Sequence, residues 1–313
     1  MQESLIKEGK ENGPKLKIKI FFSEHISEGV HSMEEDYKNC DVFIPEDANW
    51  NPEREKEWNK LSQGKVKPTE FADYFGEPRF HSFLLTQSEM VFNSKKPILF
   101  IDAPEKYNIL GKMEVMYEQY SKRIKSAKEF NDIFSATKDF LLERSELNKK
   151  RENIMKNLLP VRIKSFLEEN SDYKKKKELR VLISLGGSHT RVFHNIKARG
   201  EEITREFRKL PLVYGVYSEI ERRFSFGKDI SRDLIAQYIL HGLISSKLDN
   251  QFIDLKDDLD KMKLVDDVAA FVRSFNYEEI ESIIGNGDDV EISKRKLNNL
   301  ALSKNIKIPE FIK

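Results

Sequence analysis

The sequence predicts an α/β protein: a mostly parallel sheet with flanking helices, a helical insertion and a helical C-terminal domain. Short β-type runs alternate with helical patterns in the earlier part of the chain, and from Asp229 onward only helical spacing remains. Strands that alternate with helices are typical of βαβ units. The 313 residues allow two domains at about 150 residues each. We therefore expect an α/β domain over residues 1–227, with the insertion at about 105–175, and a helical domain over residues 228–313.

Short apolar runs mark the expected strands. Four of them are each followed by polar residues, and they cover residues 16–22, 41–44, 97–101 and 179–185. Residues 213–217 form a candidate fifth strand. The helical patterns between these runs predict a sheet whose strands are parallel.

The insertion is predicted to be helical from the spacing of its apolar residues. The residues that recur at i, i+3, i+4, i+7 and i+11 form one face of an amphipathic helix; they are Met113, Met116, Tyr117, Tyr120 and Ile124. Further along, Arg151 shares a helix face with Met155 and Leu159, so its side chain is predicted to turn inward. Pro160 is expected to end or kink that helix.

The last part of the chain shows only helical signals. Ile230, Leu234 and Tyr238 follow helical spacing, and Ser231 is a candidate N-cap. Asn286-Gly287 is a turn signal. These patterns predict the helical C-terminal domain.

Composition excludes several classes of protein. Lys and Arg number 54 against 53 Asp and Glu, a net charge of +1, which gives no electrostatic reason to expect nucleic acid. No apolar run approaches the roughly 18 residues of a membrane span. The charged N-terminus lacks the apolar region of a secretory signal, and the single cysteine, Cys40, excludes an internal disulfide and fits a reducing compartment. We expect a cytoplasmic protein with no nucleic-acid or membrane partner.

Polar side chains follow each of the four expected strands. They are Glu24 and His25, Glu46, Asp102, and His189. The carboxyl ends of parallel strands meet at one edge of a sheet, which is where ligands bind in such folds. Two imidazoles and up to three carboxylates suit a first-row divalent ion, Zn, Mn, Co or Fe, with an open position for catalysis. The sequence therefore predicts a metal centre at this edge.

Other interpretations of the same residues stay open. A polar residue after a strand is often a cap for the next helix. Ser188 is adjacent to His189 and has no triad partners, while Gly186-Gly187 could hold an anion through backbone N–H groups. The Met and Tyr stripe from Met113 to Tyr120 could face a flat apolar cofactor, but it is more simply core packing.

At these residues the sequence resembles the erythromycin esterase, ChaN, TraB and Tiki superfamily, over about residues 16–217. That group carries two G-x-x-H motifs on separate strands, an acidic residue after the second strand and an arginine in an R-[DEN]-x-x-M-like helix. Here the second motif is Gly186-Gly187-Ser188-His189, Glu46 supplies the acidic residue, and Arg151-Glu152-Asn153-Ile154-Met155 resembles the arginine motif. The first motif departs: it reads Phe22-Ser23-Glu24-His25, with Phe22 where the family has glycine.

The resemblance and the strand-end residues together imply a metal-dependent hydrolase of an unknown peptide or ester. His25, Glu46 and His189 would hold the ion, and Glu24 or Asp102 would be the general base. Arg151 would stabilise an oxyanion or anchor a substrate carboxylate. The alternatives are a ChaN-type protein that binds haem or another small ligand without turnover, with Tyr117 or Tyr120 contributing, and an inactive scaffold. Substrate, metal identity and oligomeric state are left open.

Overall fold

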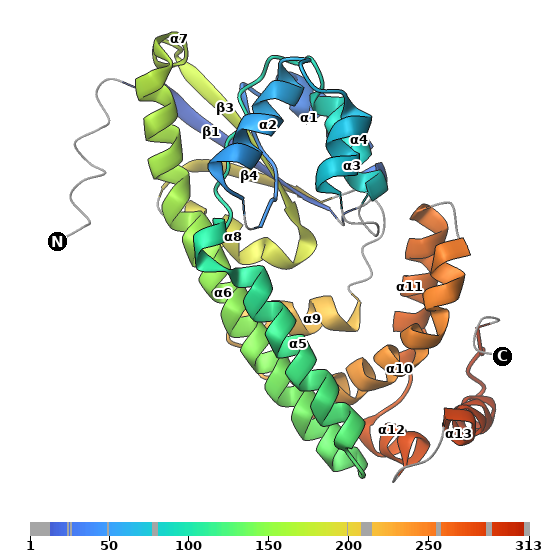
Figure 1. The fold of residues 1–313 in the computed structure, drawn as a ribbon. Coiled ribbons are helices and arrows are strands. Elements are labelled where there is room, and N and C mark those ends of the chain that lie inside the picture. The colour runs from blue at the N-terminus through green and yellow to red at the C-terminus, as the bar shows by residue number, and fades with distance from the viewer. Residues whose placement is uncertain are drawn as a thin grey trace. The chain divides into compact units, whose positions relative to one another are not determined.

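The computed structural model describes residues 13–309, apart from residues 24, 26, 49, 77–80, 199, 208–214, 255–257 and 286–289 (Figure 1). The chain divides into two compact units. The first contains Met1–Leu110 and Lys150–Leu210, and the second contains Gly111–Lys149 and Pro211–Lys313. Helix α6, Phe130–Glu169, contributes residues to both.

The first unit is built on a four-stranded, all-parallel sheet in the order β2-β3-β1-β4. Its strands are β1 (Lys15–Ser23), β2 (Val42–Ile44), β3 (Glu178–Gly186) and β4 (Glu202–Phe207). Ser23 at the end of β1 pairs with Gly186 at the end of β3. The α/β fold with a helical C-terminal part is thus confirmed, as are three of the expected strands.

Two strand predictions were wrong, and one strand was missed. Residues 97–101 form a single parallel bridge, between Phe43 and Ile98, instead of a strand. In the candidate fifth strand, Val216 begins helix α9, while residues 213 and 214 lie outside the described residues. The missed strand, β4, contains only two apolar residues, Ile203 and Phe207, and none of its residues is fully buried, so it has no apolar run that would reveal it.

Helices cover both faces of the sheet. Four of them supply the core on one face, with Phe21 and Phe43 of the sheet: α1 (Ser27–Asn39), α2 (Pro52–Ser62), α3 (Pro68–Phe75) and α4 (His81–Val91). On the other face, Ile20 and Ile183 pack with residues of α6 and of α8 (Thr190–Lys197). Alternate side chains of each strand therefore enter different cores, as the pleat requires.

Helix α6 confirms one expectation about residues 151–160 and corrects part of the other, that Pro160 would end or kink the helix. Arg151 is buried, as its spacing predicted. The helix does not end near Pro160 but continues to Glu169. Proline removes one N–H from the helix ladder, and the buried neighbours Leu159 and Ile163 anchor the helix on both sides of it.

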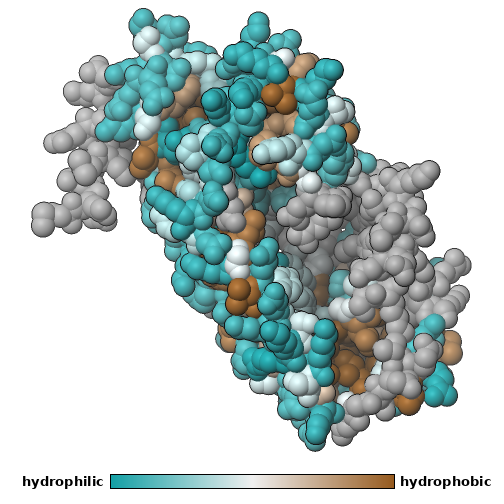
Figure 2. Space-filling model, viewed as in Figure 1, coloured by the Kyte–Doolittle hydropathy of each residue, from teal (hydrophilic) through white to brown (hydrophobic). Residues whose placement is uncertain are grey.

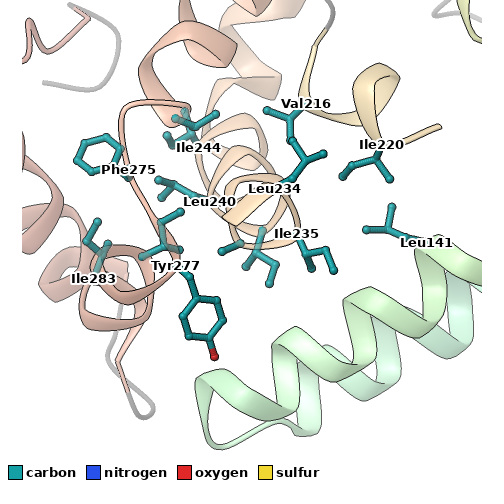
Figure 3. Packing of buried hydrophobic residues seen from close by; sticks show 14 of the residues in the cluster. Leu141, Val216, Ile220, Leu234, Ile235, Leu240, Ile244, Phe275, Tyr277 and Ile283 are labelled. Carbon is teal, nitrogen blue, oxygen red and sulfur yellow. The ribbon is translucent and has the colours of Figure 1, made fainter. Parts of the chain in front are cut away.

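The second unit is helical and has one apolar core, part of which is shown in Figure 3. Its helices, besides the first half of α6, are α5 (Ile109–Ser126), α9 (Val216–Ser225), α10 (Arg232–Asp254), α11 (Asp258–Val272), α12 (Tyr277–Ile284) and α13 (Val290–Ser303). The predicted cap is present, because Ser231 Oγ accepts from Leu234 N at 3.2 Å. The predicted turn at residues 286 and 287 lies outside the described residues.

Short elements complete the chain: η2 (Glu105–Tyr107), α7 (Ser171–Lys174) and η3 (Gly187–His189). Within the described part of the chain, no helix combines the length and the apolar character that crossing a bilayer needs.

A buried charge cluster at the carboxyl edge of the sheet

Charged side chains from five segments of the first unit meet beyond the carboxyl ends of the strands. Glu46 follows β2, Asp102 follows the extended segment beside β2, and His189 ends η3 after β3. Arg151 reaches them from α6, and His25 follows β1. Glu24 lies outside the described residues. The structure therefore brings together the other five residues that the sequence singled out.

Arg151 lies at the centre of this cluster. Its Nε and Nη2 donate to the two oxygens of Asp102 at 2.7 and 2.5 Å, and Nη2 also donates to Glu46 Oε1 at 2.7 Å. Burial opposes the charge, but Asp102 and Glu46 outweigh it and raise the pKa of Arg151. The side chain of Arg151 is 10% exposed, so this bidentate pair is almost fully removed from water.

Nitrogen atoms surround Glu46. Oε1 lies 2.7 Å from Arg151 Nη2 and 3.2 Å from His189 Nε2. Oε2 lies 3.3 Å from His25 Nε2 and accepts a short hydrogen bond from the backbone N–H of Gly186. Although burial opposes its charge, His189, Arg151 and His25 lower the pKa of Glu46 well below its usual value. Glu46 is therefore a permanent anion whose oxygens all have partners.

His189 is held between two carboxylates. Its Nε2 faces Glu46, and its Nδ1 lies 3.5 Å from Oε1 of Glu152, which is 1% exposed. Burial lowers the pKa of His189, but Glu46 more than compensates and raises it to about 9. This shift favours the imidazolium form of His189 at neutral pH, in which Nε2 faces both Glu46 and, at 3.2 Å, Nη1 of Arg151.

Glu152 was missed by sequence reasoning. The sequence places it in the arginine motif next to Arg151, whose side chain is predicted to turn inward. A charged residue that is buried there needs a partner of opposite charge. The structure gives it two cationic neighbours, His189 and, with Nη1 at 3.9 Å from Oε2, Arg191. Glu152 therefore extends the cluster along α6.

His25 is the most accessible member of the cluster. Its side chain is 33% exposed and its ring lies 5.0 Å from the ring of Phe83, centroid to centroid. In the tautomer with its proton on Nε2, His25 donates to Glu46, and Nδ1 is then the ring nitrogen without a proton. A histidine oriented by a carboxylate in this way is the arrangement of a general base.

The predicted metal set does not fit a resident ion in this arrangement. A metal ligand needs a free lone pair, but both oxygens of Glu46 already have nitrogen neighbours, and His189 Nε2 already faces Glu46 and Arg151. The guanidinium of Arg151 supplies the positive charge that an ion would supply. Among the described residues, no three His, Cys, Asp or Glu side chains form a metal-binding group. Metal binding stays a prediction, and the geometry favours a site without it.

A side chain at position 186 would crowd the charge cluster. A Cβ at Gly186 would lie 3.2 Å from Glu46 Oε2 and 3.6 Å from His25 Nε2. We expect Gly186→Ala to destabilise the protein by about 1–3 kcal/mol, because Glu46 must move away from its partners. Gly187→Ala is the matched control, since a Cβ there meets no atom within 4 Å. Equal unfolding midpoints in urea for the two variants would contradict this account.

The two tyrosines considered for haem belong to the second unit. Tyr117 and Tyr120 both pack against Phe140 there, and the Tyr120 hydroxyl contacts Thr137. Each therefore has a packing role in the helical core.

Comparison with known proteins adds no name to the site. A scan against family models found no match, and neither did searches of curated proteins and of solved structures.

Proposed function

We propose that this protein is a hydrolase of a small-molecule or peptide ester, in which His25 is the general base. The observation that carries the proposal is the contact between His25 and Glu46 at the carboxyl edge of the parallel sheet. His25 Nδ1 would take a proton from water as the water oxygen attacks the substrate carbonyl, and the protonated ring would return that proton to the leaving alcohol oxygen as the ester C–O bond breaks. This role for His25 replaces the metal-ligand role that the sequence suggested.

The rest of the cluster supports His25 in this proposal. Glu46 holds the ring of His25 and stabilises the imidazolium that forms when the proton is taken. Arg151 and His189 keep Glu46 ionised and fixed in place. Arg151 thus acts as a positioning residue, because its guanidinium is already bound to Asp102 and Glu46.

The proposal includes a cytoplasmic location. Cys40 is a free, buried thiol, and a protein that keeps its single cysteine reduced fits a reducing compartment.

The test is ester hydrolysis by His25 variants. We expect the purified protein to hydrolyse members of a panel of nitrophenyl esters and lactones, and His25→Gln to lower kcat/KM by about 100-fold or more with an unchanged melting temperature. His31→Gln is the matched control, because His31 is an exposed histidine that also contacts a glutamate, Glu34, at 2.9 Å.

Three outcomes would contradict the proposal. They are no hydrolysis across the panel, equal activity in both histidine variants, and activity that chelators abolish and a divalent metal restores. The last would favour the metal-dependent reaction that the sequence predicted. A Soret absorption band without hydrolysis would instead favour haem binding.

A further inference from the structure

A groove with a volume of about 660 Å³ lies in the first unit between α2 and α3. It is separate from the His25 and Glu46 contact, since neither residue lines it. In Figure 2 the surface over α2 and α3 is mostly hydrophilic, with apolar atoms showing between the two helices. Aromatic and acidic side chains shape the groove; the principal ones are Glu53, Glu57, Glu70, Glu105, Tyr74 and Phe75.

Aromatic rings form one wall. Tyr74 is 80% exposed, and its ring meets Phe75 edge to face with 4.6 Å between centroids. Apart from this contact with Phe75, most of the tyrosine side chain is open to solvent. Its ring face is available to a cation, and such contacts with organic cations contribute most when they are partly shielded from water.

The charge of the lining is acidic. Four glutamates and two basic residues, Arg54 and Lys56, line the groove. Glu57 is paired with Lys60 at 2.6 Å, so Glu53, Glu70 and Glu105 determine the acidic charge of the lining. Arg54 is not available to neutralise them, because its Nε donates to the buried carboxylate of Asp47 at 2.5 Å. No described residue forms an ion pair with Glu53 or Glu70, which come from opposite helices. The lining therefore complements a positively charged occupant.

The floor of the groove is preformed. Phe71 packs on Trp58 with 4.8 Å between centroids, and Arg54 lies 4.8 Å from the centre of the Phe75 ring. At one end, Asn51 donates to Glu105 at 3.0 Å. A groove whose walls are already fixed loses little conformational entropy when it binds a ligand.

We infer that the groove between α2 and α3 binds a lysine- or arginine-bearing peptide segment of a partner protein. The basic side chains of the peptide contact Glu53 and Glu70 on the two walls, and one of them lies over the ring of Tyr74. This inference does not rest on the proposed hydrolase, because it uses none of the residues of the charge cluster.

The test is the binding of a capped tetralysine peptide to the full chain, measured by calorimetry at low salt and again at 0.3 M salt. We expect saturable binding that weakens with salt, and no binding of capped tetraglutamate. Trp50 and Trp58, the two tryptophans of the chain, both lie beside the groove. Trp58 contacts Phe71, and the carbonyl oxygen of Trp50 accepts from the backbone N–H of Glu105 at 2.9 Å. Their fluorescence should change over the same peptide concentrations.

Variants locate the binding. Glu53→Gln/Glu70→Gln should raise the Kd roughly tenfold, as two exposed ion pairs allow, and Tyr74→Ala should raise it about threefold. The control, Glu35→Gln/Glu168→Gln, makes the same charge change at two exposed sites outside the groove lining and should leave the Kd unchanged. No heat of binding, tighter binding of tetraglutamate, or equal effects of the two double variants would overturn the inference.

Discussion

Replacing Arg151 with lysine is expected to lower the free energy of unfolding by about 2–3 kcal/mol. Lysine keeps the positive charge but cannot reproduce the two parallel bonds to Asp102 together with the bond to Glu46. Asp102 is 1% exposed, so it has no water to replace the lost donors. Arg151→Met should cost more, about 3–5 kcal/mol, because it leaves buried carboxylates without a counter-charge.

Thermal unfolding measures this effect. For a protein of this size the melting temperature should fall by roughly 3–5 °C in Arg151→Lys. Arg123→Lys is the control, since Arg123 forms a single exposed ion pair with Asp139 and should change stability by less than about 0.5 kcal/mol. If Arg151→Lys melts like the wild type, the positioning role fails, and the direct contact with substrate that the sequence suggested becomes the better explanation.

Stability should also fall as the pH rises from about 6.5 to 9. The pKa of His189 is raised to about 9 in the folded protein, against about 6.5 for an unfolded histidine. A raised pKa means that the stabilisation is complete below the unfolded value and is lost as pH rises through the folded value. The expected loss from this residue is about 3 kcal/mol between the two pKa values.

Urea unfolding at pH 6 and pH 9.5 tests this expectation. The wild type should lose stability between these pH values, and His189→Gln should lose much less because it cannot titrate. His31→Gln, at an exposed histidine, should behave like the wild type. An equal pH dependence in the wild type and in His189→Gln would show that His189 is not held as an imidazolium.

The fold could be predicted where the sequence pattern and the packing agree. The apolar runs of β1 and β3 are buried on both faces, and such strands read as near-continuous apolar stretches. Strand β4 was not predicted because it lies at the edge of the described sheet, where it pairs with β1, and none of its residues is fully buried. The spacing of apolar residues in α6 also did not show that the helix belongs to two units, because both halves of the helix bury apolar residues.

The candidate site was predictable in its members but not in its pairings. Helical spacing with Met155 and Leu159 was enough to predict that Arg151 turns inward. It could not show that Asp102 and Glu46, from two distant loops, would both bind the guanidinium. In the structure, the two carboxylates that the sequence suggested for a metal and for proton transfer both bind this arginine.

The position of β1 in the sheet has a consequence for how the chain folds during synthesis. Both neighbours of β1 are late in the sequence: Lys15 pairs with Glu178, and Lys17 with Glu202. Strand β1 is therefore synthesised about 160 residues before β3 and about 185 residues before β4, and such non-local pairing slows folding. Lys15, Lys17 and Lys19 alternate with the apolar residues of its first half. Charges of this kind disfavour the pairing of a strand that still lacks its partners with a strand of another nascent chain.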